Sequence, residues 1–132
     1  MAMEAALRAR LITDPATSWI VDNRVHWLLR PQGGALPAIV LQLISEIRGQ
    51  HLKGFQAIVE SRVQVNCLAA SHVAAVDLAE AAIAAIAPEG DELEVTFMRA
   101  MIEAQADDAE ETPTGFVFRR RFDARLFWKS NS

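Results

Sequence analysis

Alternation of apolar and polar side chains between Ile58 and Leu68 is the strongest constraint that this sequence places on its fold. Successive side chains of a β-strand point to opposite faces of a sheet, so the pattern predicts a strand with one buried and one solvated face. The apolar positions are Val59, Val63, Val65 and Cys67, and the polar positions are Glu60, Arg62, Gln64 and Asn66. Other elements of the chain must therefore cover the apolar face of this strand.

A second strand and a long connection precede the alternating segment. The strongly apolar run Ala38–Ile44 is typical of a strand in the interior of a sheet. Ser45–Ala57 is polar and contains two glycines, and its 13 residues exceed the usual length of a hairpin connection. One interpretation is a mobile loop. The other is an arm that binds a partner, because Leu52 and Phe55 are apolar where contact with solvent is expected.

Periodicity and turn residues predict the remaining elements. The predicted helical segments are Met3–Thr13, a short turn from Pro15 to Val21, and a helix that Ser71 caps and that runs to Ala87. The predicted strands are Val25–Leu29, Leu93–Met101 and Phe116–Trp128, and the acidic run Glu103–Thr112 is predicted to be a solvated connection. The order α-β-β-β-α-β-β predicts one α+β domain over residues 1–132, with a single mixed or mainly antiparallel sheet and helices on one face.

Length and composition indicate an ordinary folded domain. The chain has 132 residues, of which 52% are hydrophobic and 23% are charged, a balance that disfavours both disorder and a membrane class. Polar and charged residues interrupt even the longest weakly charged stretch, Val63–Ala87, so no membrane-spanning segment and no membrane partner are expected. The first residues lack the pattern of a secretory signal, which favours synthesis in the cytoplasm.

The sequence offers no set of residues suited to catalysis or metal binding. The histidines at positions 26, 51 and 72 lack a ligand spacing, and Cys67 is the only cysteine, which excludes an intrachain disulfide. The paired glycines of Pro31–Pro37 precede a strand rather than a helix, which disfavours a phosphate site. The acidic run lacks the spacing of a calcium loop. We therefore predict no catalytic residue, no cofactor, no metal and no enzymatic activity.

Basic and aromatic side chains are interleaved near the end of the chain. Arg119, Arg120, Arg121 and Arg125 lie in the strand predicted from Phe116 to Trp128. Alternation places most of the aromatic rings on the face opposite the basic groups, whereas a stacking platform for nucleic acid requires both on one exposed face. The net charge of −4 also gives no general footprint for nucleic acid. Non-specific contact with passing DNA is kept only as an added role.

Several segments, in order along the chain, resemble the phage tail completion or tail terminator proteins of long-tailed phages, prophages and gene transfer agents. The most specific are RPQGGALPAIVLQ at positions 30–42 and SRVQVNCLA at positions 61–69. The similarity covers residues 5 to 87, and FRRRFDARLFW resembles the closing strand of the family. Leu68 departs from the aromatic residue that members often carry after the cysteine. The acidic run at 103–112 matches no signature of the family.

This resemblance implies a structural virion protein that is made in the bacterial cytoplasm and sits at the head-proximal end of the tail. Its subunits would form a ring, expected to be a homohexamer, that caps the tail tube and joins it to the head-tail connector protein. Within the same class, the alternative is another connector component, such as a head-completion or tail-adaptor protein. From a different class, a small ligand-binding or regulatory α+β domain stays open. The assembly state separates ring formation from that last alternative.

The candidate site residues follow from this implied assembly. An arm suits insertion into a neighbouring subunit or the last ring of the tube, with apolar anchors and charges that set the register. Charges on the solvated face of the sheet suit pairing between adjacent subunits. The predicted partner-binding residues are Arg48, His51, Leu52, Lys53 and Phe55 in the arm, and Glu60, Arg62, Arg119, Arg121 and Arg125 on the sheet.

Overall fold

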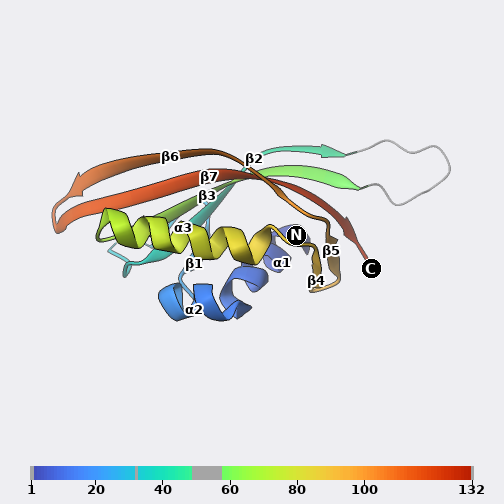
Figure 1. Ribbon diagram of the computed structural model, residues 1–132, viewed down its shortest axis with the longest axis horizontal. Helices are drawn as coiled ribbons and strands as arrows, with labels where there is room; N and C mark the ends of the chain where they lie inside the picture. The colour runs from blue at the N-terminus through green and yellow to red at the C-terminus, as the bar shows by residue number, and fades with distance from the viewer. Residues whose placement is uncertain (1, 32, 49–57, 132) are drawn as a thin grey trace.

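A computed structural model describes residues 2–31, 33–48 and 58–131 as a single curled sheet with all three helices on one side (Figure 1). The helices are α1 (Ala2–Thr13), α2 (Pro15–Val21) and α3 (His72–Ile86). The strands are β1 (Val25–Trp27), β2 (Ala38–Arg48), β3 (Val59–Ala69), β4 (Gly90–Glu92), β5 (Val95–Phe97), β6 (Met101–Thr112) and β7 (Gly115–Ser130). The predicted α+β class is confirmed.

The strands run in the order β1-β2-β3-β7-β5-β4, and β6 also pairs with β7. The β1–β2 pair is parallel and the other pairs are antiparallel, which makes the sheet mixed. Two hairpins extend from opposite ends of this sheet: β2 and β3 run out past β5 at one end, and β6 and β7 run out past the start of α3 at the other (Figure 1). We call the side that carries the helices the inner face and the other side the outer face.

The alternation in β3 has the predicted result. Val59, Val63, Val65 and Cys67 are buried, and Glu60, Arg62 and Gln64 are partly exposed on the outer face. Asn66 is the exception among the polar positions, since it is only 6% exposed, and its Nδ2 donates to the carbonyl oxygen of Val40 at 3.2 Å. The buried hydroxyl of Ser61 accepts a hydrogen bond from Nε1 of Trp128 at 2.9 Å. The polar groups that this strand buries are therefore satisfied.

The core lies between the inner face and the helices. Helix α3 begins where predicted, because the hydroxyl of Ser71 accepts from the backbone N–H of Ala74 at 3.2 Å as an N-cap. Small residues on the buried side of α3, such as Ala75, Ala79 and Ala82, allow it to pack closely against β3 and β7. Large side chains fill the space around it, among them Leu7, Leu11, Leu41, Leu78, Ile86, Phe97, Phe122 and Leu126.

The prediction that Glu103–Thr112 is a solvated connection was wrong, because these residues form most of β6. The strand pairs with β7 over almost its whole length, with Asp107 opposite Arg120 and Asp108 opposite Arg119. Opposite charges in directly facing positions stabilise a pair of strands, whereas an acidic run considered alone indicates only solvation. The basic cluster of β7 is therefore the counterpart of the acidic run.

The predicted strand Leu93–Met101 is shorter in the structure, where β5 covers only Val95–Phe97. The first two residues of the predicted segment form a turn, with Leu93 at φ 47° and Glu94 at φ 64°, that joins β4 to β5 in a short hairpin. Positive φ at both central positions is typical of the turns that fit the twist of a hairpin, although glycine or asparagine usually occupies them. The strand predicted at Val25–Leu29 ends at Trp27, because Leu28 has a φ of 71°.

The predicted arm begins later than its polar sequence indicated. Strand β2 continues through Ser45–Arg48, and Arg48 pairs with Val59 of β3. A register shift between Leu43 and Ser45 marks a bulge in the hairpin. Positions 49–57, which include His51, Leu52, Lys53 and Phe55, lie outside the described residues.

Candidate functional site

A network of ion pairs crosses three strands on the outer face. Nη2 of Arg62 lies 3.2 Å from Oε1 of Glu103, and Nη2 of Arg125 lies 3.1 Å from Oε2 of the same carboxylate. Longer contacts join Arg62 to Asp123 at 3.8 Å and Arg125 to Glu60 at 3.9 Å. Three of the residues predicted to bind partners, Glu60, Arg62 and Arg125, therefore pair within their own chain.

The other two predicted arginines of the sheet share a single carboxylate. Nε of Arg119 lies 2.8 Å from Oδ1 of Asp108, and Nη1 of Arg121 lies 2.9 Å from Oδ2. Together with the network above, the outer face brings four arginines against four acids in these contacts. A balanced surface of this kind attracts no polyanion, which weakens the case for contact between this face and DNA.

A second cluster ties the β6–β7 hairpin to the start of α3 on the inner side. Nη2 of Arg120 donates to Oδ2 of Asp107 at 2.9 Å, and Nε2 of His72 lies 3.2 Å from the same oxygen. These contacts, from Arg120 first and His72 second, lower the pKa of the Asp107 carboxyl below its ordinary value. The sequence grouped Arg120 with its neighbours, but its even position places it on the opposite face from Arg119 and Arg121.

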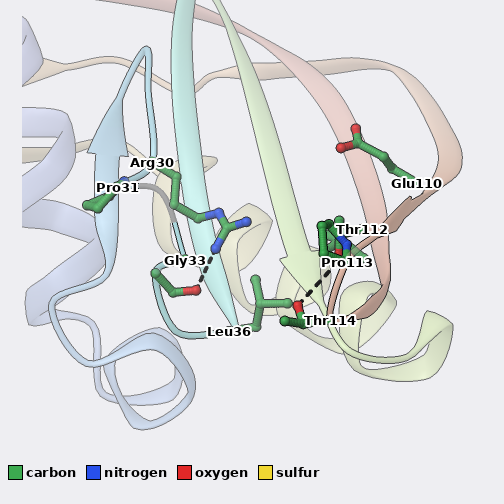
Figure 2. A pocket seen from close by; sticks show the side chains of 10 residues that line it. Arg30, Pro31, Gly33, Leu36, Glu110, Thr112, Pro113 and Thr114 are labelled. Atoms are coloured by element: carbon green, nitrogen blue, oxygen red, sulfur yellow. Dashed lines mark hydrogen bonds between the residues drawn. The ribbon is translucent and has the colours of Figure 1, made fainter.

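The outer face is hollowed between residues 28–31 and 33–36 on one side and the β6–β7 hairpin on the other (Figure 2). Two adjoining cavities of about 550 and 400 Å³ share Arg30 and Glu110, and we call them together the outer groove. Gln42 of β2 and Gln64 of β3 lie on its floor. The exposed side chains of Leu28 and Leu29 form part of its wall.

Some polar groups of the outer groove form hydrogen bonds within the chain. Nη1 of Arg30 donates to the carbonyl oxygen of Gly34 (Figure 2). The Thr112 hydroxyl donates to the carbonyl oxygen of Gly115 at 2.6 Å. A Cβ atom at Gly34 would lie 2.9 Å from the carbonyl oxygen of Pro31, so glycine permits the tight turn of this wall. The groove therefore combines apolar surface with the carboxylate of Glu110, which has no ion-pair partner among the described residues.

Exposed apolar side chains also gather at the far end of β2 and β3. Ile44, Ile47 and Ile58 are all exposed, and Ile47 most of all, at 61%. Arg48 lies beside them, with its Nη2 3.0 Å from Oε2 of Glu46. We call Leu43–Arg48 together with Ile58 the hairpin end. It is the described part of the predicted arm and the strand that supports it.

Reactive chemistry is sparse in the described parts of the chain. Within them, no three His, Cys, Asp or Glu side chains are grouped so that they could hold a metal ion. Burial raises the pKa of the Cys67 thiol well above its ordinary value, which keeps it protonated and a poor nucleophile. No helix in the same ranges is long and apolar enough to cross a bilayer.

A family model described as tail completion protein gp17 matches residues 5–127 of this sequence. The chain belongs to the tail completion protein family. A solved structure described as the virion of a native gene transfer agent particle contains a chain with the same fold, at a TM-score of 0.63 and 16% sequence identity. The superposition covers 96% of this chain and 95% of the other. No curated protein matches the sequence.

Family membership makes the chain a structural protein of a phage-type tail and a component of a phage-like particle. The resemblance stated from the sequence is thereby confirmed. A structural family agrees with the expected lack of enzymatic activity, which stays a prediction. The ten proposed partner-binding residues of this tail completion protein also stay predictions: five lie on the outer face in ion pairs, Arg48 lies at the hairpin end, and the other four lie outside the described residues.

Proposed function

We propose that this tail completion protein forms a ring, a hexamer by the resemblance to tail terminators, that caps the finished tail tube and joins it to the head-tail connector. The observation that carries the proposal is the placement of two projecting hairpins at opposite ends of one sheet (Figure 1). A subunit that presents different surfaces at its two ends is suited to head-to-tail contacts, which generate a ring when the rotation closes.

The outer-face ion pairs have a defined part in this proposal. They hold β3, β6 and β7 together on a solvated face, so that the hairpins project from a rigid sheet. Glu60, Arg62, Arg119, Arg121 and Arg125 remain partner-binding residues in the proposal, because their charges are only partly buried and can exchange partners with an adjacent ring. Such an exchange of ion-pair partners fixes the relative orientation of the two rings more than it strengthens their binding.

The arm supplies the contacts that bind the neighbouring protein in this proposal. Arg48 is exposed at the hairpin end, and the sequence that follows contains His51, Leu52, Lys53 and Phe55. Apolar anchors surrounded by polar groups are the usual composition of an interface centre. We propose that these residues contact a neighbouring subunit or the last ring of the tube.

Light scattering of the purified protein, alone and with polymerising tube protein, tests the proposal. We expect a particle near six times the chain mass of 14.5 kDa, or rings at tube ends once tube protein is added. Growth of the tubes should stop when the protein is added. A chain that stays monomeric and neither binds nor caps tubes would overturn the proposal. Binding to the connector alone would instead favour a head-completion or tail-adaptor role.

A further inference from the structure

We propose that the hairpin end of one subunit docks in the outer groove of the next, which makes this pair of surfaces the repeating contact of the ring. The inference rests on the proposed ring and specifies how its subunits meet. The occupant of the groove is a second copy of this chain, and the contact is head-to-tail.

The two surfaces lie at opposite ends of the same strand. Ala38, at the start of β2, follows directly on the segment that walls the outer groove, and Arg48 ends the strand at the hairpin end. Ten residue steps of an extended strand span about 33 Å. The hairpin end therefore points away from the groove of its own subunit, and only the groove of another copy can receive it.

The two surfaces also expose apolar side chains that have no cover within the described chain. Leu28 and Leu29 on the groove wall are 65% and 77% exposed, and the hairpin end exposes Ile44, Ile47 and Ile58. Exposed apolar side chains that gather in one place mark interaction surfaces. Docking one surface on the other covers both sets at once. Each subunit then buries its groove and its hairpin end in two different contacts.

Charge favours the same pairing. Glu110 lies on the rim of the outer groove and has no ion-pair partner among the described residues. The hairpin end presents Arg48, which is 60% exposed and whose Nη2 lies 3.0 Å from Oε2 of Glu46, so that docking exchanges this surface ion pair for one with Glu110. When Arg48 of one subunit enters the groove of the next, the carboxylate of Glu110 gains an ion-pair partner. It lacks such a partner among the described residues of its own subunit. Such complementary charges fix orientation and speed association.

Cross-linking of two single-cysteine variants tests the contact. Ile47→Cys places a thiol at the hairpin end, and Leu29→Cys places one on the groove wall; both positions are exposed, so the fold tolerates the change. We expect a short bis-maleimide to link a mixture of the two variants into dimers while each variant alone gives none. The double variant should give a ladder up to the full ring. The buried, protonated thiol of Cys67 does not react.

The control pairs Ile47→Cys with Trp19→Cys, since Trp19 is 90% exposed on α2, on the helix side of the sheet. All pairs are measured in the assembled state, with tube protein present if assembly requires it. Rings that link only through position 19, or through Ile47→Cys alone, would overturn the docking contact and leave the ring intact. Failure to assemble under any condition would overturn the proposed function and this inference together.

A charge exchange gives a second readout. Glu110→Arg and Arg48→Glu should each weaken association at least about tenfold, because like charges then meet in the groove. Combining the two substitutions should restore most of the lost association. Equal effects that simply add in the double variant would contradict the pairing.

Discussion

Nη2 of Arg120 donates a hydrogen bond to Oδ2 of Asp107 at 2.9 Å across the β6–β7 hairpin. The two residues face each other in the strand register, and His72 of α3 reaches the same carboxylate at 3.2 Å. The Arg120–Asp107 contact joins the two strands of the hairpin, and the His72 contact connects the hairpin to the start of α3. The opposite hairpin, β2–β3, has a different attachment, in which buried Trp128 and Ser61 meet beneath it.

The Asp107 contacts predict a pH-dependent stability. Because the folded pKa of Asp107 is lowered, its stabilising effect is present above the ordinary pKa of a carboxyl and is lost as the pH falls through the folded pKa. Asp107→Asn should therefore lower the melting temperature at pH 7, and the difference from the unmodified protein should shrink as the pH falls below about 4. Thermal unfolding at a series of pH values measures this.

Glu111→Gln is the matched control, because Glu111 is in the same strand, lies outside the outer groove and has no ion-pair partner among the described residues. Its melting temperature should follow that of the unmodified protein at every pH. A similar pH dependence for both variants would mean that the effect arises from net charge rather than from the Arg120 and His72 contacts.

Replacement of Trp128 by phenylalanine tests the base of the β2–β3 hairpin. The substitution leaves the buried Ser61 hydroxyl without its donor, although that hydroxyl still donates to Oε1 of Glu46 at 3.0 Å. We expect a loss of about 1–2 kcal/mol in the free energy of unfolding, measured in urea. Trp19→Phe on the exposed surface of α2 should change it by less than about 0.5 kcal/mol. Equal losses of unfolding free energy for the two substitutions would show that the smaller aromatic side chain, and not the hydrogen bond to Ser61, accounts for the effect.

Cys67 provides a probe of global unfolding. Burial and the raised pKa of its thiol predict that a thiol reagent modifies it only when the sheet opens. The rate of modification should rise with urea in parallel with unfolding followed by circular dichroism. Rapid modification in the native state would show that β3 opens locally. Ile47→Cys, at an exposed position, should react at once in the same assay.

Deletion of residues 49–54 separates the arm from the fold. We expect the variant to keep its melting temperature within a few degrees and to lose assembly entirely, because the polar sequence predicts an arm that buries little core surface. Thermal unfolding and light scattering on the same sample measure both properties. A parallel loss of stability and assembly would show that the arm is part of the core.

The sequence predicted the elements whose signals are local. Alternation identified β3, and Ser71 identified the start of α3, because both patterns depend only on neighbours in the chain. Strand β6 was missed because its acids are stabilised by arginines of β7, and the register that brings them together is not a local property. The β4–β5 turn was missed because Leu93 and Glu94 adopt positive φ without the usual turn residues.

The candidate site also has features that the local sequence predicts and features that depend on the tertiary structure. The polar face of β3 was predictable, but the pairing of Arg62 and Arg125 with Glu103 depends on where β6 lies. The outer groove had no sequence signal of its own, since its wall and its rim come from segments about 80 residues apart in the chain. The predicted strand Val25–Leu29 includes the exposed Leu28 and Leu29, although their position before a proline- and glycine-rich segment indicates the edge of a loop.

The mass of the assembled particle tests the central claim most directly. Light scattering of the protein mixed with tube protein, combined with electron microscopy of the tube ends, should find closed rings of six subunits seated on one end of each tube. Tubes that continue to grow in the presence of the protein, with the protein itself monomeric at 14.5 kDa, would contradict the account.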